Sequence, residues 1–135
     1  MSEISLYFTP IKKSQENYED DQIGGLIKTY HSEFPDIKSG SIAIFYVPEN
    51  RGSMNGESES NSVGFRDAFN RLHVGKSWKK DIYDLGDNLP GKELKDTHFA
   101  LSNVVSELVK SNVLPLIVGG AQDLLLGIYG GYAKL

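Results

Sequence analysis

The sequence predicts an α/β fold in which helices pack on both faces of a small parallel sheet, a three-layer, Rossmann-like arrangement. One observation supports this class. Apolar runs typical of buried strands alternate with stretches of helical periodicity along residues 41–135. That alternation favours a parallel sheet with right-handed crossover connections. We therefore expect about three parallel strands in the spatial order 2-1-3, with flanking helices.

Composition and charge limit the classes of function. The chain has 135 residues, of which 39% are hydrophobic and 24% charged, a balance typical of one globular domain. Its formal net charge is -4 and its basic residues are not clustered, so we expect no nucleic-acid partner. The absence of cysteine excludes disulfides and thiolate metal sites and fits a cytoplasmic protein. No apolar run approaches the roughly 20 residues of a membrane span, so we expect no membrane partner.

Residues 1–39 predict an N-terminal arm and a weak helix. The alternation of Ile4, Leu6 and Phe8 indicates a short strand, or an apolar arm that lies on the body of the protein. Residues 20–31 indicate a helix whose propensity is lowered by two glycines.

Residues 40–135 carry the predicted central strands. Residues 42–47 form the first strand, because they are apolar on both faces, as in parallel sheets. A long polar loop follows at residues 49–61, and such a loop either borders a site or is a mobile surface segment. Residues 81–87 form the second strand, which turns at Gly86.

Three helices connect and follow these strands. Residues 63–72 place apolar side chains at i, i+3, i+4 and i+7, and Ser62 can cap the N-terminus of that helix. The longest helix covers residues 94–110 and ends where Asn112 can take the left-handed conformation. The last helix, residues 124–132, contains glycines that lower helix propensity but permit close backbone packing.

The most informative stretch is residues 113–123. An apolar run leads into a double glycine, and a leucine-rich helical pattern follows at once. This order predicts a buried strand, a tight turn and a helix. Ligands of parallel α/β sheets usually bind at the carboxyl ends of the strands. We therefore place the candidate binding site at Gly119, Gly120, Gln122 and Asp123.

The residues alone do not complete a catalytic constellation. The turn lacks the Lys-Ser/Thr ending of a P-loop and the spacing of a dinucleotide-binding loop, although a helix N-terminus can still hold an anion. The aspartates at positions 84 and 87 are a possible carboxylate pair, but we interpret Asp84 and Asp87 as turn-capping residues. We assign no catalytic residue.

Acids and histidines also occur without a recognisable metal motif. The acidic residues of 16–21 suit the start of a helix, where they oppose the helix dipole, better than a metal site. His31, His73 and His98 lie on three different predicted elements and form no HxxxH or HxH pair. We interpret each as a surface or capping histidine and assign no metal ligand.

The ordered set of motifs resembles the ureohydrolases, the family of arginase, agmatinase and formimidoylglutamase. Residues 113–120 resemble their strand and double glycine, residues 82–87 resemble their second strand, and residues 43–48 resemble their first strand. The similarity runs in the same order over most of residues 40–135. It is closest to formimidoylglutamase-like proteins, including the opening residues 4–8.

The resemblance implies an arginase-like fold around an eight-stranded parallel sheet and hydrolysis of guanidino or formimino groups at a two-manganese centre. In that family the double glycine is followed by a small or acidic residue and then by a manganese-binding histidine. This sequence has Ala121 and Gln122 at those two positions. The family's other metal ligands belong to later strands that are absent here. We therefore expect no cofactor on this chain, although the family uses manganese.

Three interpretations follow. In the first, residues 40–135 are the N-terminal part of an arginase-like domain in a hydrolase that acts on C–N bonds of a formimino or guanidino small-molecule substrate and is not active as this chain alone. In the second, the chain is a non-catalytic ureohydrolase-like binding or interaction protein. In the third, it is a flavodoxin-like anion-binding module. An incomplete sheet leaves an unpaired strand edge, through which we expect a possible homodimer.

Overall fold

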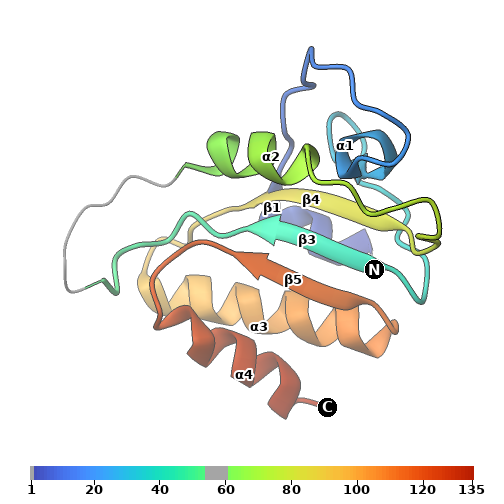
Figure 1. The fold of residues 1–135 in the computed structure, drawn as a ribbon. Helices are drawn as coiled ribbons and strands as arrows, with labels where there is room; N and C mark the ends of the chain where they lie inside the picture. The colour runs from blue at the N-terminus through green and yellow to red at the C-terminus, as the bar shows by residue number, and fades with distance from the viewer. Residues whose placement is uncertain (1, 54–60) are drawn as a thin grey trace.

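The structure is a computed structural model that describes residues 2–53 and 61–135. Strands and helices alternate along the chain as β3 (Ile42–Tyr46), α2 (Ser62–Asn70), β4 (Ile82–Asn88), α3 (Leu94–Lys110), β5 (Leu114–Val118) and α4 (Leu124–Ala133). Figure 1 shows three layers, with α2 on one face of the sheet and α3 and α4 on the other. The predicted α/β class is confirmed. Among the described residues, no helix has the length and apolar character needed to cross a membrane.

The sheet has five strands rather than about three. Its path runs β1-β4-β3-β5, and β2 also pairs with β4. The strands β3, β4 and β5 are mutually parallel, with β3 between the other two. The two additional strands are short and come from the N-terminal segment: β1 (Phe8–Thr9) is antiparallel to β4, and β2 (Lys28–Thr29) is parallel to it. Both lie along the edge of β4 that β3 does not occupy.

The N-terminus begins with a 3-10 helix and not with the expected strand. This helix covers Ser2–Tyr7 and leads directly into β1. Ile4 and Phe8 are buried in the core, whereas Leu6 is 79% exposed. In an extended strand the three side chains would share one face. The helical turn instead directs Leu6 to solvent, so only two of the three apolar residues anchor the segment.

The predicted helix of residues 20–31 is also largely wrong. Only α1 (Ile23–Leu26) is helical, and the chain then extends into β2. The backbone N–H of Tyr30 donates to the carbonyl of Asp84 at 2.9 Å. Pairing with β4 therefore satisfies backbone groups that a longer helix would have satisfied internally. Local propensity could not reveal this choice, because the pairing partner lies more than fifty residues away.

The core explains why β3 is apolar on both faces. Ala43 and Phe45 are fully buried in the cluster that α3 covers, and Ile44 points to the smaller cluster beneath α2. The buried face of α3 repeats with helical periodicity and comprises Leu101, Val104, Val105 and Leu108. Asn112 ends that connection with φ of 58°, as predicted. The two-sided burial of β3 makes it the centre of the fold.

The start of α2 differs from the prediction by one residue. Asn61 is the N-cap, and its side-chain oxygen accepts a hydrogen bond from the backbone N–H of Gly64 at 2.9 Å. Ser62, the expected cap, is the first helical residue. Its hydroxyl donates instead to a carboxylate oxygen of Asp87 at 3.0 Å. The serine thus ties the beginning of α2 to the end of β4.

The β5 edge of the sheet is more exposed to solvent than the sequence indicates. Leu114 and Leu116 of β5 are 59% and 42% exposed, so the prediction of a buried strand is wrong here. Helix α4 lies against α3 where Gly127 and Gly131 let the two backbones approach, as predicted. Its outer surface carries further exposed apolar side chains, namely Leu125, Leu126, Tyr129 and Tyr132.

Candidate functional site

The carboxyl ends of the three parallel strands meet at one edge of the sheet. Tyr46 at the end of β3 pairs with Val118 at the end of β5 and with Asp87 near the end of β4. The turn after β5 and the loop after β3 leave the sheet from this edge. Part of that loop, residues 54–60, lies outside the described residues, so its predicted role at the site stays a prediction.

The double glycine forms the predicted tight turn. Gly119 and Gly120 have φ of 83° and 81°, a conformation that L-residues with side chains rarely adopt. A Cβ at Gly119 would lie 2.6 Å from the Tyr46 ring. A Cβ at Gly120 would collide with the side chain of Leu124 and approach the Val47 carbonyl. Both glycines are therefore required by the path of the chain, independently of any ligand.

The two polar residues of the predicted site have different surroundings. Gln122 is exposed. Asp123 stands at the N-terminus of α4, but its side chain does not cap the helix. Instead, one carboxylate oxygen lies 2.7 Å from Nε2 of His98, which comes from the early part of α3. The interpretation of His98 as a surface or capping histidine did not include this contact, through which His98 links α3 to the candidate turn.

A second polar network holds the loop after β3 at the same edge. The Glu49 carboxylate is buried and accepts hydrogen bonds from Nε of Arg51 at 2.9 Å and from the Thr97 hydroxyl at 2.8 Å. Arg51 also donates to the carbonyl of Gly91 at 2.7 Å. The hydrogen bonds from Arg51, followed by that from Thr97, outweigh burial and hold the pKa of Glu49 below its ordinary value of 4.5. This network is a structural clamp between the loop and the start of α3.

The described residues at this edge do not fit a manganese centre. A transition metal needs several imidazole or carboxylate ligands that converge on one point. Within the described ranges, the one group of three such side chains with ligand atoms within 4.8 Å of one another is Glu19, Asp21 and His73. Glu19 and Asp21 precede α1 and His73 follows α2, so none of the three comes from the carboxyl ends of β3, β4 or β5. Gln122 contributes a neutral amide, which is a weaker ligand than imidazole.

The two aspartates of β4 form ion pairs with Arg66, and Asp84 also accepts a hydrogen bond from the backbone N–H of Gly86 at 2.9 Å, which agrees with its predicted capping role. Asp84 receives two hydrogen bonds from Arg66, from Nε at 2.8 Å and from Nη2 at 3.0 Å. Asp87 receives one from Nη1 at 2.6 Å. The Arg66 and Asp84 side chains are only 9% and 5% exposed. We name this group the Arg66 triad; it joins α2 to β4 through charges that are largely removed from water.

A bulge in β4 explains how aspartates three residues apart reach the same arginine. Along a regular strand, residues three apart point to opposite faces. Ile44 of β3 pairs with Asp84, but Tyr46 pairs with Asp87, so β4 holds one extra residue between the two pairs. Gly86 lies in this bulge with φ of 91°. The strand therefore continues through Gly86 instead of turning there, and both carboxylates face α2.

The Arg66 guanidinium stays charged in this site. Burial acts to lower its pKa, but the hydrogen bonds and negative charges of Asp84 and Asp87 outweigh burial and raise the pKa above its ordinary value. With two carboxylates around one guanidinium, the triad has a formal charge of -1. A buried carboxylate without this arginine would be costly, so the three side chains act as one unit.

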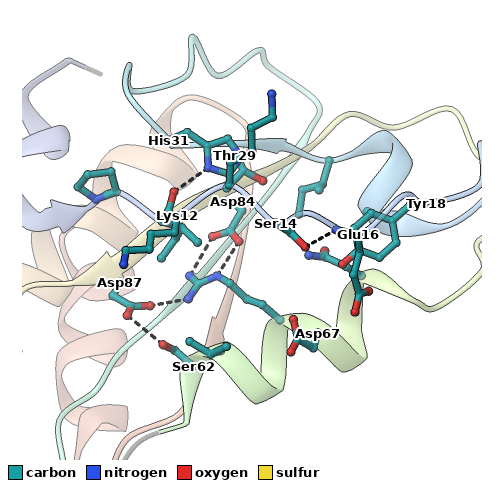
Figure 2. A pocket seen from close by; sticks show the side chains of 18 residues that line it. Lys12, Ser14, Glu16, Tyr18, Thr29, His31, Ser62, Asp67, Asp84 and Asp87 are labelled. Carbon is teal, nitrogen blue, oxygen red and sulfur yellow. Dashed lines mark hydrogen bonds and ion pairs between the residues drawn. The ribbon is translucent and has the colours of Figure 1, made fainter.

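A cavity of about 470 Å³ lies between the triad and the N-terminal segment. Its lining comes from residues 10–18, from residues 24–31, and from α2 and β4 (Figure 2). The picture shows Lys12, His31, Asp84 and Asp87 among the side chains that line it. Nδ1 of His31 is held by the carbonyl of Ile11 at 2.7 Å. The cavity combines residues from four separate parts of the chain, and the sequence reasoning did not find it.

Two signals in the sequence could have pointed to the missed residues. Asp84 interrupts an otherwise apolar buried strand, and a buried carboxylate needs a cationic partner, which the neighbouring helix supplies in Arg66. His98 stands three and four positions before Leu101 and Ser102, on the stripe of α3 that packs against α4. Neither signal identifies the partner residue, because both partners are distant in sequence.

Comparisons with solved structures give the class of fold. The chain is similar to formimidoylglutamase from Bacillus subtilis, with a TM-score of 0.66 and 20% sequence identity, over 92% of this chain and 42% of that chain. It is also similar to formiminoglutamase from Trypanosoma cruzi, in a structure with Mn²⁺, with a TM-score of 0.59 and 20% identity, over 97% of this chain and 40% of that chain. No model of a protein family and no curated protein matches the sequence.

The chain thus has an arginase-like α/β fold. More particularly, its fold is that of formimidoylglutamase structures, and the resemblance read from the sequence motifs is confirmed at the level of the fold. At 20% identity the likeness does not carry substrate or activity. The chain spans less than half the length of both similar proteins.

Proposed function

We propose that this chain is the N-terminal part of an arginase-like hydrolase that cleaves a C–N bond of a formimino or guanidino small molecule, and that it is not active alone. The observation that supports this proposal best is the match of 92% of the chain to B. subtilis formimidoylglutamase with a TM-score of 0.66. The absence of cysteine is compatible with our proposal of a cytoplasmic location.

In this proposal the carboxyl edge supplies one wall of the site. Gly119 and Gly120 bring the start of α4 close to the end of β3, and the Glu49 clamp holds the neighbouring loop. Hydrolysis adds water to the formimino or guanidino carbon and breaks its C–N bond, which releases formamide or urea and an amine. The residues that activate this water would come from outside the 135 residues, because the described edge has no group suited to a metal centre.

The open side of the sheet supports the need for further structure. Strand β5 has a free edge in the described sheet, and Leu114 and Leu116 are exposed beside it. Leu125 and Leu126 of α4 are also exposed, at 67% and 68%. Exposed apolar side chains in such number are typical of an interface. We propose that in the complete protein additional strands and helices cover these side chains.

The test compares two proteins. The complete reading frame that contains these residues and the 135-residue chain would be purified in parallel, and release of formamide and urea would be measured with formimino and guanidino substrates, with and without added Mn²⁺. We expect turnover by the longer protein and none by the chain alone. A longer protein that hydrolyses neither class of substrate would overturn the proposal.

The second candidate is a non-catalytic ureohydrolase-like binding protein. Gln122 favours it, because an exposed amide stands where the family has a histidine ligand. We expect the 135-residue chain to retain no manganese after dialysis, as measured by elemental analysis. If the longer protein also retains none and does not turn over substrate, the binding role replaces the hydrolase. The flavodoxin-like alternative is weakened by Asp123, whose carboxylate would repel an anion at the N-terminus of α4.

A further inference from the structure

We propose that the cavity beneath the N-terminal segment binds a short zwitterion, a molecule with an ammonium group at one end and a carboxylate at the other. This inference is independent of the proposed hydrolase. It concerns the hollow of Figure 2, which is formed by the arm at residues 10–18, by α2 and by β4. A volume of about 470 Å³ lies within the range of sites for small molecules.

The first step is the charge of the α2 and β4 wall. The Arg66 triad contributes a formal charge of -1, and Asp67 of α2, which also lines the cavity, adds another carboxylate. Among the described residues, Asp67 has no ion pair within 4.0 Å. This wall therefore attracts a cation and repels a lone anion. An ammonium or similar N–H donor is the chemical group that suits it.

The second step is the charge of the opposite wall. The arm contributes Lys12 and Lys13 to the cavity lining. Neither ammonium group has an ion-pair partner within 4.0 Å in the described part of the chain. Glu16 lies on the same arm, but its carboxylate is engaged by Arg71 at 2.7 Å. The arm thus presents two free positive charges to a cavity whose other wall is negative, which makes the cavity dipolar.

The third step is an orphan acceptor inside the cavity lining. The side-chain oxygen Oδ1 of Asn70 is buried and has no hydrogen-bond partner among the described residues. Asn70 follows Asp67 by one turn on α2, so the two side chains lie on the same wall. A buried acceptor without a donor is costly. A ligand ammonium at this wall can donate to Asp67, beside the Asn70 amide, while its carboxylate faces the lysines.

A single-charge ligand would satisfy only half of these groups. A simple amine would leave Lys12 and Lys13 unpaired, and a simple carboxylate would face the Arg66 triad and Asp67 without a donor of its own. A molecule with separated charges pairs with both walls at once. The apolar part of the lining, which includes Ile11 and Val63, suits a short hydrocarbon spacer between the two charged ends.

The test uses 5-aminovalerate as the probe, with pentylamine and valerate as analogues that each keep one charge. Each would be titrated into the 135-residue chain by isothermal calorimetry at low salt. We expect 5-aminovalerate to bind. Each analogue lacks one of the two charged groups and so loses one ion pair with the cavity. If that pair contributes a free energy at the upper end of the range measured for exposed ion pairs, each analogue should bind at least about fivefold more weakly. No binding of 5-aminovalerate, or equal binding of the three, would overturn the proposal.

Variants locate the binding. Asp67→Asn removes the free carboxylate, and Lys12→Gln with Lys13→Gln removes the two ammonium groups; we expect either change to weaken 5-aminovalerate several-fold. The matched controls are Asp36→Asn, an exposed aspartate elsewhere, and Lys79→Gln with Lys80→Gln, a second adjacent lysine pair outside the cavity. Binding that survives both cavity variants, or that falls equally in the controls, would place the probe elsewhere and overturn the proposal.

Discussion

The two neighbours of the central strand β3 differ in how completely this chain covers them. On one side, β4 is buried, carries β1 and β2 along its outer edge, and is joined to α2 by the Arg66 triad. On the other side, β5 ends the sheet and exposes Leu114 and Leu116. The N-terminal segment therefore completes one side of the fold, and the other side presents a surface that further structure can use.

This difference indicates which side of the sheet should control folding stability and which side should control association with other chains. Charges withdrawn from water and a strand packed on both faces make the β4 side sensitive to single substitutions. An exposed strand edge tolerates polar replacements, because its side chains already contact water, but it promotes pairing with other chains. Substitutions on the two sides should therefore change different measured quantities.

The largest effect is expected at the Arg66 triad. Arg66→Ala leaves Asp84 buried without a cation, so the free energy of unfolding should fall by about 3–5 kcal/mol, measured by urea denaturation. Arg71→Ala is the matched control near the C-terminal end of the same helix, because its ion pair with Glu16 is exposed. A similar loss for the two variants would contradict the view that the triad holds the β4 side together.

The next effect is expected at the bulge of β4. Gly86→Ala imposes a positive φ on alanine and drives its Cβ against the Thr9 carbonyl of β1. Gly40→Ala is the control, because Gly40 has φ of 82° but open space around it. Gly40→Ala should cost about 1–2 kcal/mol from backbone strain alone, and Gly86→Ala should cost at least about 1 kcal/mol more from steric overlap. Equal losses in thermal unfolding would mean that β1 does not constrain the bulge.

The pH dependence of stability tests the carboxyl ends of the parallel strands, which belong to both the β4 side and the β5 side of the sheet. The folded pKa of Glu49 is lowered, so the folded protein binds fewer protons than the unfolded chain near that pKa. The contribution of Glu49 is therefore complete above its ordinary pKa of 4.5 and is lost as the pH falls from there through the lowered folded value.

Arg51→Gln removes the main cause of that shift. Unfolding free energies measured from pH 7 to pH 3 should therefore fall less steeply with acid in Arg51→Gln than in the unmodified chain. Lys79→Gln, which alters an exposed lysine without an ion pair in the described residues, is the control and should keep the original slope. An unchanged slope in Arg51→Gln would show that the Glu49 clamp does not control acid stability.

The smallest effect on stability is expected at the open side, where association should change instead. We predict that the 135-residue chain dimerises through the β5 edge, and that Leu116→Lys lowers the dimer fraction with little change in unfolding free energy, because Leu116 is already 42% exposed. Light scattering across a concentration series measures this. Leu6→Lys, at an exposed leucine on the opposite side of the sheet, is the control. A monomer at all concentrations would contradict the prediction.

The strands and helices of residues 40–135 were accessible from the sequence, since their patterns are local. Residues 42–47 are apolar at every position, and α3 repeats its buried leucines and valines with helical spacing. The N-terminal segment was less accessible. Its β2 strand forms because it pairs with β4, and a local pattern does not contain that partner. Leu114 and Leu116 were read as buried, because apolar character alone does not tell a central strand from an edge strand.

The candidate site also has one part that could be predicted from the sequence and one part that could not. Gly119 and Gly120 mark a turn that the sequence places correctly, since few other residues adopt their backbone conformation. The link between Asp123 and His98 was not accessible, because it depends on how α3 and α4 pack. The assignment of Gly119, Gly120, Gln122 and Asp123 as ligand-binding residues stays a prediction.

By itself, the sequence determined the α/β class, the order of the main elements, the tight glycine turn and the likeness to ureohydrolases. Each depends on the periodicity or conformational limits of neighbouring residues. Only the tertiary structure decided that Asp84 and Asp87 share Arg66, that the N-terminal segment closes the β4 side, and that β5 is left at an edge. The physical reason is that burial and charge pairing are properties of groups brought together in space, and the partner of a side chain is not encoded at any fixed distance along the chain.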